Sequence, residues 1–479
     1  MIEFEAVIGL EVHAQLSTQT KLFCGCSTAF GAPPNSQTCP VCLALPGALP
    51  VPNEKAVEYA VMAALALDCD IQAISEWSRK NYFYPDLPKG YQITQFDKPY
   101  ALGGGVEITG EKQTTRKIEL VRIHMEEDAG KNIHSENGDY SLIDFNRASV
   151  PLIEIVSQPQ LRTPEEAAQY LRRLRQILVS IGVCDGNMEQ GSFRCDANVS
   201  IRPRGEKKLG TRVELKNINS FKFVTQAIHF EIVRQEQVIT SGQSVVQETR
   251  LWDSNAKLSK SMRRKEEADD YRYFPDPDLP LLLIDSAFID QLRRHLPELP
   301  QKKLARFVSE MGLSHYDAQI LTDDHEVAQF FEQAMLHYHA PKTLANLLIS
   351  QVMGWMNAHD QIINKIKIAP KDLASLAKKI DADEISGKIA KEILTEILQT
   401  GESPEQVMAK KDLIQIKDTS LIEAAAKKII ADNPKQHEQY QAGKIAVFGY
   451  FVGQLMKATQ GKANPGLANE ILKKLLDEK

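Results

Sequence analysis

The sequence predicts an α+β protein in which an antiparallel-sheet domain comes first and all-helical domains follow. Residues 1–294 repeatedly alternate apolar and polar side chains with the period of two that half-buried strands require. Beyond that region the apolar residues recur at helical spacing. Every arginine lies at or before Arg306, and lysine replaces it in the rest of the chain. The composition therefore changes close to where the hydrophobic pattern changes.

Breaks that contain proline suggest where the domains end. Residues 296–300 include two prolines, which cannot continue a helix, and residues 401–404 combine glycine and serine with another proline. After the second break, residues 418–420 can cap one helix, and Asn464-Pro465 can begin another. We therefore expect three domains, at residues 1–294, 295–405 and 406–479.

The overall composition excludes some classes of protein. The chain has 479 residues, of which 43% are hydrophobic, and 57 Lys and Arg stand against 63 Asp and Glu, for a net charge of −6. A generally basic nucleic-acid-binding protein is therefore excluded, and any contact with RNA must be local. The acidic start at Glu3 and Glu5 is unlike a signal peptide, and no apolar run approaches the ~18 residues of a membrane span. We expect a cytoplasmic protein that does not bind membranes.

Four strand-like segments of the first domain place polar residues on one face and apolar residues on the other. They begin near residue 2, at residue 118, at residue 192 and after a turn at residues 203–206. The polar residues are Glu11, His13 and Gln15 in the first segment, Arg122, His124 and Glu126 in the second, Ser192, Arg194, Asp196, Asn198, Ser200 and Arg202 in the third, and Arg212, Glu214 and Lys216 in the fourth.

A solvated sheet face is the ordinary explanation of such alternation. The composition favours another, because carboxylates, imidazoles and guanidinium groups replace the Thr, Lys and Gln of an ordinary wet face. Carboxylates suit Mg²⁺, and cations neutralise phosphate. The candidate metal ligands are Glu11, Glu126 and Asp196 with His13 nearby, and the candidate phosphate-binding cations are Arg194, Arg202, Arg212 and Lys216. The chain has no Walker A pattern, so a nucleotide would bind across the sheet face.

Four of the seven cysteines form two close pairs near the N-terminus. Cys24 and Cys26 are separated by twelve residues from Cys39 and Cys42. Two such pairs can complete a tetrahedral zinc site, and because sulfur would fill all four positions we expect a structural role. Four unligated thiols are the alternative.

Three further features leave two explanations open. The segments at residues 79–92 and 261–275 are rich in aromatic and basic residues, so each is either a surface loop or a binding loop. From residue 408 onward, 12 lysines stand against 8 acidic residues, and Gly449 and Gly453 lie one helical turn apart. This tail is suited to RNA phosphates, although small residues also serve helix packing.

Seven motifs taken together are familiar. They are VIGLEVHAQL at residues 7–16, the four-cysteine cluster, DLPKGYQ at 86–92, HMEEDAGK at 124–131, RCDANVS at 194–200, ELKNINS at 214–220 and DYRYFP at 270–275. They closely resemble the B subunits of bacterial aspartyl/glutamyl-tRNA amidotransferases, the GatB family. This resemblance implies a catalytic cradle related to the glutamine synthetase fold, with a zinc loop, then a helical domain and a small YqeY-like tail that contacts tRNA.

The resemblance also implies an activity. The GatB subunit phosphorylates the side-chain carboxylate of Glu-tRNA(Gln) or Asp-tRNA(Asn) with ATP and Mg²⁺, and ammonia from the glutaminase A subunit then forms the amide. The implied assembly is a heterotrimer with A and C subunits. The family's metal-binding and catalytic positions fall on Glu11, His13, Glu126 and Asp196, with Glu127 as an alternative to Glu126. Asp269 stands where histidine is expected.

Two other functions remain open at this stage. One is a zinc-containing tRNA-binding protein without chemistry, although unneutralised carboxylates on the sheet face would repel RNA. The other is a ligase that takes free ammonia without a partner subunit. Which mischarged tRNA is the substrate also stays open.

Overall fold

The structure, a computed structural model, describes residues 3–109, 114–135, 138–264, 271–411, 419–459, 463 and 465–477. The chain forms two compact units, Met1–Leu299 and Pro300–Lys479. A large sheet dominates the first unit, and the second is built from helices, so the predicted α+β class is confirmed. Among the described residues, no helix combines the length and the apolar character that crossing a membrane requires.

Ten strands of the first unit form one sheet, in the order β15-β14-β13-β12-β1-β11-β8-β6-β2, and β7 pairs with β8. All pairs are antiparallel except β13 with β14. The strands of this sheet are β1 Phe4–Gln15, β2 Asp70–Ile71, β6 Ala101–Leu102, β7 Gly105–Thr109, β8 Thr115–Glu127, β11 Pro151–Ser157, β12 Phe193–Pro203, β13 Val213–Ile218, β14 Glu248–Asp253 and β15 Leu258–Arg264. The predicted first strand is thus the centre of the sheet.

Three smaller sheets join segments that are far apart in the sequence, in the orders β10-β9, β16-β4-β5 and β17-β3. Their strands are β3 Ile74–Ser75, β4 Ser78–Asn81, β5 Tyr91–Thr94, β9 Lys131–His134, β10 Ser141–Asp144, β16 Phe274–Pro275 and β17 Leu282–Leu283.

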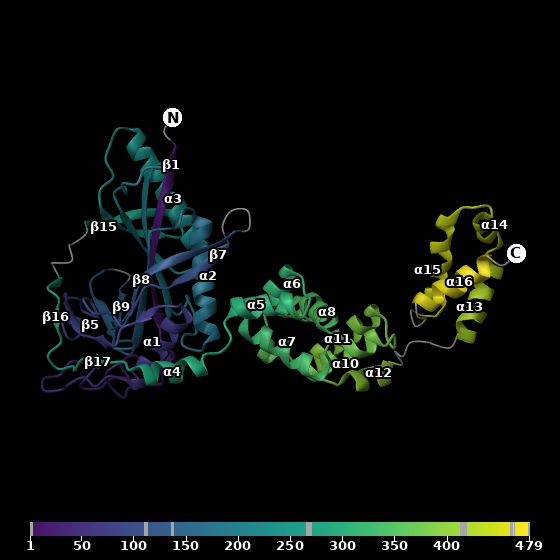
Figure 1. Cartoon of the computed structure of the whole chain (residues 1–479), viewed down its shortest axis with the longest axis horizontal. Coiled ribbons are helices and arrows are strands. Elements are labelled where there is room, and N and C mark those ends of the chain that lie inside the picture. Colours follow the sequence, from purple (N-terminus) through teal and green to yellow (C-terminus); the bar gives the residue numbers. More distant parts are fainter. Residues whose placement is uncertain are drawn as a thin grey trace. The chain divides into compact units, whose positions relative to one another are not determined.

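Two capped helices pack on the sheet unit. The hydroxyl of Thr163 accepts a hydrogen bond from the backbone N–H of Glu166 and caps α2, and Ser220 caps α3 in the same way. The two helices, both labelled in Figure 1, contact each other. Helix α3 also contacts β12 and β13. The helices of this unit are α1 Glu54–Ala66, α2 Pro164–Ser180, α3 Phe221–Thr240 and α4 Ser286–His295.

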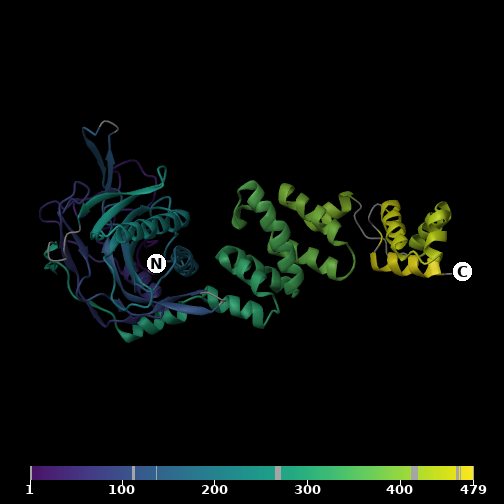
Figure 2. The ribbon, with the colours of Figure 1, turned by 90° about the horizontal axis from the view of Figure 1, so that it is seen from above.

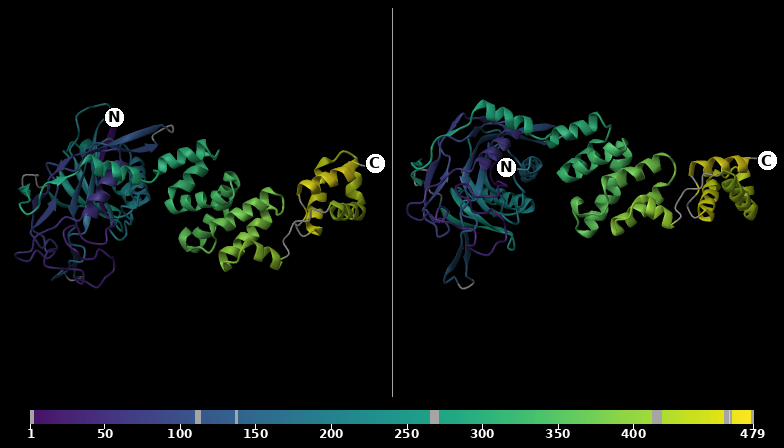
Figure 3. Two further views of the ribbon diagram at one scale, coloured as in Figure 1. Left: turned by 60° about the horizontal axis from the view of Figure 1, so that its bottom comes forward. Right: turned by 90° about the horizontal axis from the view of Figure 1, so that it is seen from below.

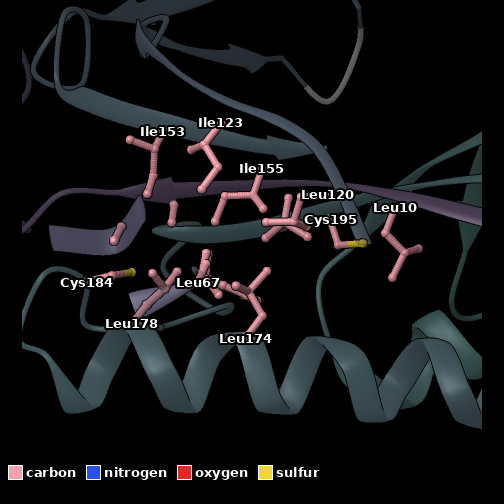
Figure 4. Packing of buried hydrophobic residues seen from close by; sticks show 14 of the residues in the cluster. Leu10, Leu67, Leu120, Ile123, Ile153, Ile155, Leu174, Leu178, Cys184 and Cys195 are labelled. Atoms are coloured by element: carbon pink, nitrogen blue, oxygen red, sulfur yellow. The ribbon is translucent and has the colours of Figure 1, made fainter. Parts of the chain in front are cut away.

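One face of the sheet is apolar and forms the core with α2 (Figure 4). In this view the apolar side chains of the strands lie above Leu174 and Leu178 of the helix. The strand residues are Leu10 of β1, Leu120 and Ile123 of β8, Ile153 and Ile155 of β11 and Cys195 of β12, each at most 2% exposed. Because successive side chains alternate, the intervening residues must lie on the other face of the sheet.

The second unit has two separate apolar clusters, one within residues 307–408 and one within residues 422–476. Helix α13 begins at Thr419 and α16 at Pro465, as predicted, whereas Asp418 and Asn464 lie outside the described residues. Figures 2 and 3 show this unit in green and yellow. Its helices are α5 Pro300–Ser309, α6 His315–Asp323, α7 His325–His337, α8 Pro341–Leu347, η3 Leu348–Val352, α9 Met353–His359, η4 Ile363–Lys365, α10 Pro370–Asp381, α11 Gly387–Thr400, α12 Pro404–Lys411, α13 Thr419–Asp432, α14 Pro434–Gln441, η5 Ile445–Val447, α15 Phe448–Ala458 and α16 Pro465–Asp477.

The contact between α2 and the sheet predicts a large effect of truncating its core residues. Leu174 is 0% exposed, so Leu174→Ala should lower the free energy of unfolding of the sheet unit by about 2–5 kcal/mol. Leu283, which is 70% exposed, provides the control, and Leu283→Ala should change it by less than about 0.5 kcal/mol. Urea unfolding followed by hydrogen exchange of the β1 amides measures both, and equal effects would contradict the assignment of the core.

Candidate functional site

The strand register brings the polar residues of four strands together on the face opposite α2. Across the sheet, Arg194 of β12 pairs with His13 of β1, His13 pairs with Glu154 of β11, and Glu154 pairs with His124 of β8. Two residues along β1, Glu11 pairs with Asp196 of β12. These rows are continuous only because β1 lies between β11 and β12.

A cluster of one imidazole and two carboxylates lies at the centre of this face. The Nε2 atom of His13 is 3.4 Å from Oε1 of Glu126 and 3.3 Å from Oε2 of Glu154. One potential ligand atom from each of these residues lies within 4.8 Å of the others. His124 borders the cluster, with its Nε2 atom 3.5 Å from the Glu154 carboxylate. This arrangement can hold a metal ion.

The imidazole and the carboxylates of this cluster stabilise one another in their charged forms. Burial by itself would lower the pKa of His13, but the carboxylates of Glu154, Glu126 and Asp196 raise it to about 9. Burial would raise the pKa of Glu154, yet His124, His13 and Lys80 hold it well below its usual range. Without a metal ion, protonated His13 and Lys80 balance the carboxylates of this cluster, and a bound metal ion would take the place of the His13 proton.

A second group of carboxylates lies beside the first. Asn198 donates a hydrogen bond of 2.8 Å to Glu11, and Lys216 Nζ lies 2.6 Å from Asp196 and 3.4 Å from Glu214. Burial raises the pKa of Glu11, and repulsion from Glu154, Glu214 and Asp196 raises it further. The Oδ1 atom of Asn198 is buried and has no hydrogen-bond partner among the described residues. An acceptor left unpaired beside crowded carboxylates is a favourable position for a cation.

A cavity of about 830 Å³ opens at the end of the strands where β1 finishes. Its wall includes Arg194 and Asp196 of the polar face and residues from the segments 28–37, 144–147, 185–192 and 217–219. Arg194 donates hydrogen bonds of 3.0 and 3.1 Å to both carboxylate oxygens of Asp128, which also accepts one from Gln15. The carboxylate face and the cavity are therefore continuous.

The four clustered cysteines converge as their spacing predicts. Potential ligand atoms of Cys24, Cys26, Cys39 and Cys42 all lie within 4.8 Å of one another, and none forms a disulfide. The fully buried Lys21 places its Nζ atom 3.6 Å from the Cys42 sulfur and 3.1 Å from the carbonyl oxygen of Phe145. The Cys24 thiol and Lys21 help to hold the pKa of Cys42 below its usual value. The segment between the two cysteine pairs supplies one wall of the cavity.

Comparisons with known proteins decide the family. A family model described as the GatB/GatE catalytic domain matches residues 6–290, and one described as the GatB domain, whose name also includes YqeY, matches residues 329–476. The chain belongs to the GatB family.

Full-length relatives agree with this assignment. The B subunit of the aspartyl/glutamyl-tRNA(Asn/Gln) amidotransferase of Myxococcus xanthus is 53% identical over 476 residues, which cover 99% of each chain. The proteins with the same name from Thermodesulfovibrio yellowstonii and Geobacter sp. strain M21 are 50% and 52% identical and cover at least 99% of both chains. The resemblance drawn from the seven motifs is therefore confirmed.

In this GatB-family chain, the structure places some predicted site residues together and separates others. Glu11, His13, Glu126 and Asp196 share the polar face with Arg194 and Lys216. Arg202 pairs instead with Glu5 at 2.6 Å, six residues along β12 from Asp196 and therefore roughly 20 Å away. Arg212 is exposed and lies before β13 begins. The expected grouping of Arg202 and Arg212 with the carboxylates is not found. Both arginines lie toward the loop that joins β12 to β13, away from the carboxylates.

The alternative to Glu126 also has a clear position. Glu127 points away from the cluster, with Lys89 Nζ 2.5 Å from its carboxylate and the backbone N–H of Ile93 donating to it at 2.9 Å. Asp269 lies outside the described residues.

Sequence reasoning missed Glu154 and did not count Glu214 among the metal ligands. Glu154 belongs to a strand that is otherwise apolar on both faces until Ser157, so no alternation identified it. A single glutamate within such an apolar run was the available signal, because a lone buried carboxylate requires a partner.

The two aromatic and basic segments prove to be neighbours. β4 pairs with both β5 and β16, and Asn81 donates hydrogen bonds to the backbone of Tyr271 and Arg272. Lys80 Nζ lies 4.9 Å from the centre of the Tyr271 ring. Burial lowers the pKa of Lys80, but Tyr273 and the carboxylates of the polar face outweigh this effect and raise it. The segments therefore adjoin the site.

The Arg194–Asp128 pair makes a prediction about pH. Burial raises the pKa of Asp128, but Arg194 and Arg147 lower it below its ordinary value. The pair therefore stabilises the fold above about pH 3.9, the pKa in the unfolded chain, and this contribution is lost as the pH falls through the lower pKa of the folded protein. Arg194→Met should cost about 2 kcal/mol at pH 7 and progressively less below about pH 4.

Urea unfolding at several pH values measures this dependence. Arg204→Met is the control, because Arg204 and its partner Glu3 are 65% and 68% exposed and such pairs contribute little. If the loss of unfolding free energy in Arg194→Met does not change with pH, the ion pair between Arg194 and Asp128 is not the cause of that loss.

Proposed function

We propose that this chain is the kinase and transamidase subunit of a tRNA-dependent amidotransferase. In this proposal it uses ATP to phosphorylate the side-chain carboxylate of Glu-tRNA(Gln) or Asp-tRNA(Asn), and ammonia then displaces the phosphate to give Gln-tRNA(Gln) or Asn-tRNA(Asn). The observation that supports it most strongly is the pair of adjoining carboxylate clusters on one sheet face, in a chain of the GatB family. The enzyme class is a ligase that forms a C–N bond with glutamine as the amide donor.

The residues present fit magnesium ions. The polar face offers carboxylate and amide oxygens, the donors that Mg²⁺ prefers. The raised pKa of Glu11 and the unpaired Oδ1 atom of Asn198 both point to a position for a cation. The residues that would hold the ions are His13, Glu126 and Glu154 in one cluster and Glu11, Asp196 and Glu214 in the other. When bound, the ions supply neutralisation of the charge on the transferred phosphoryl group.

The cations of this chain bind and orient the anionic substrates in this mechanism. Lys216 of β13 contacts Asp196, and Arg194, two residues before Asp196 on β12, binds Asp128. They attract phosphate oxygens to the carboxylate face. One substrate carboxylate oxygen bonds to the γ-phosphorus as the bond to ADP breaks. The ammonia nitrogen then bonds to the side-chain acyl carbon as the bond from that carbon to the phosphate oxygen breaks, and phosphate leaves with one proton from the ammonia.

We also propose that the four-cysteine cluster binds a structural zinc ion. The Cys39 and Cys42 sulfurs are 3.9 Å apart, close to the ~3.8 Å edge of a tetrahedron whose Zn–S bonds are about 2.3 Å. Four thiolates would fill every position of the ion, so the site is suited to holding the loop rather than to catalysis. The Lys21 ammonium group would offset part of the thiolate charge.

The remaining parts of the proposal concern the partner subunits, the cellular location and the domain organisation. We propose a cytoplasmic heterotrimer with a glutaminase A subunit, which supplies ammonia, and a C subunit. We further propose that residues 295–405 form a helical domain and residues 406–479 a tRNA-binding tail. Apart from its chain neighbours and the backbone of its own helix, a Cβ atom added at Gly449 or Gly453 would meet no described atom within 4 Å, which leaves room for an external contact there. A relation of the sheet domain to glutamine synthetase stays part of this proposal.

The carboxylate clusters predict which substitutions abolish activity. Glu11→Ala, Glu126→Ala, Asp196→Ala and Glu154→Ala should each lower ATP-dependent phosphorylation of the aminoacyl-tRNA by at least about 10³-fold, because each removes a ligand from the charge-neutralising site. Phosphate transfer from γ-labelled ATP in the complex with the A and C subunits measures this.

Glu107→Ala provides the control, since Glu107 is an exposed glutamate of the edge strand β7. It should retain wild-type activity. Wild-type rates in the four cluster variants, together with intact tRNA binding, would instead favour a tRNA-binding protein without chemistry.

The zinc proposal predicts one zinc ion per chain in the purified protein. Cys42→Ser should lose most of it, because three thiolates leave the tetrahedron incomplete. Cys69→Ser should keep it, since Cys69 lies outside the cluster and contacts the carbonyl oxygen of Gly103. Elemental analysis gives the stoichiometry. Absence of zinc from wild-type protein, with four freely reactive thiols, would exclude the site.

A further inference from the structure

The loop between β12 and β13 concentrates positive charge at a place that the carboxylate site does not use. Residues 204–212 contain four cations and one anion, in a chain with a net charge of −6. Lys207, Lys208 and Arg212 are exposed and form no ion pair with any residue that the structure describes. Among the residues that the structure describes, Arg204 forms an ion pair with the exposed Glu3 alone. Three cations are therefore available to an external partner.

Two hydrogen bonds and one close backbone contact fix the backbone of this loop. Arg202, paired with Glu5, donates a hydrogen bond of 3.2 Å from its Nη1 atom to the carbonyl oxygen of Lys207. The N–H of Arg204 donates to the carbonyl oxygen of Glu3 at 2.9 Å. A Cβ atom at Gly210 would lie 2.1 Å from the carbonyl oxygen of Ile201, so only glycine permits this close approach. The loop thus presents its cations from an anchored backbone, which reduces the entropy lost on binding.

Further arginines surround Arg202 at the base of the loop. Arg116 and the backbone N–H of Arg162 both donate to one carboxylate oxygen of Glu166. Burial, Arg202 and Arg116 all lower the pKa of Arg162. Glu5 and Glu166 balance part of this charge. The exposed cations above them have no such partner among the described residues.

We propose that this basic loop binds the phosphate backbone of an RNA, and that it does so for the tRNA whose aminoacyl end lies at the carboxylate face. This inference rests on the proposed function. The loop has one exposed apolar residue, Leu209 at 55%, whereas a protein interface needs an apolar centre and is depleted in lysine. Lysine and arginine side chains without partners suit phosphates, which position a nucleic acid without reading its sequence.

The position of the loop supports this partner. Arg202 at its base lies roughly 20 Å along β12 from Asp196, on the same side of the strand. An RNA whose end reaches the carboxylates would extend its backbone over this distance. In this arrangement the sheet face would act on the aminoacyl group of the tRNA, and the loop would bind the phosphate backbone of the same tRNA.

The test compares wild-type protein with the variant Lys207→Ala/Lys208→Ala/Arg212→Ala, each in complex with the A and C subunits. The Kd for purified tRNA is measured at several salt concentrations. We expect the variant to bind about tenfold or more weakly near 0.1 M salt, with the slope of log Kd against log salt reduced by about 2–3 because three counterion-releasing contacts are lost. The KM for ATP and the rate at saturating tRNA should stay unchanged.

The control variant is Lys55→Ala/Lys98→Ala/Lys117→Ala. It removes the same charge from exposed lysines, each paired with a carboxylate, and should keep the wild-type Kd and slope. If the loop variant unfolds, the milder Lys207→Gln/Lys208→Gln replaces it, with an expected reduction of the slope by about 1–2.

Each other outcome overturns a defined claim. Equal effects of the loop and control variants would show that only net charge matters and would exclude the loop as a binding surface. Loss of the A or C subunit from the loop variant, with unchanged affinity for tRNA, would make the loop a protein interface instead. If the wild-type complex binds no tRNA, the proposed function fails and this inference fails with it.

Discussion

Several carboxylates of like charge lie buried or half-buried together on one sheet face, and the first unit is organised around keeping them there. Loss of water and repulsion from Asp196, Glu214 and Glu154 both oppose the ionisation of Glu11. The fold offsets this cost with cations and imidazoles from neighbouring strands, of which His13 is the most central. The apolar face against α2 supplies the stability that such a polar face cannot supply.

Strand order decides which of these groups meet. β1 pairs with β11 on one side and β12 on the other, so its alternate residues face carboxylates and cations from both neighbours. A slip of one residue in either register would turn His13 and Glu11 toward α2 and expose Leu10 and Val12. The same long strands also separate two charged regions along their length, because Asp196 lies among the carboxylates and Arg202 lies at the base of the basic loop.

The cysteine loop connects the site to the rest of the unit through ordinary hydrogen bonds. Lys21 joins the Cys42 sulfur to the carbonyl oxygen of Phe145, whose neighbours Asn146 and Arg147 line the cavity. A loosened loop would therefore change the cavity wall without touching the carboxylates.

The sequence by itself determined the features that depend on local geometry. Alternation placed Glu11 and His13 on one face, and spacing brought Cys24 and Cys42 into one cluster, because strand period and short loops fix such relations within a few residues. Only the tertiary structure decided that Glu154 completes the first cluster. It belongs to a strand that is apolar on both faces, and its neighbours come from sequence positions more than 100 residues away for β1 and about 30 for β8. Pairing between distant strands is set by the packing of the whole sheet, and no local pattern encodes it.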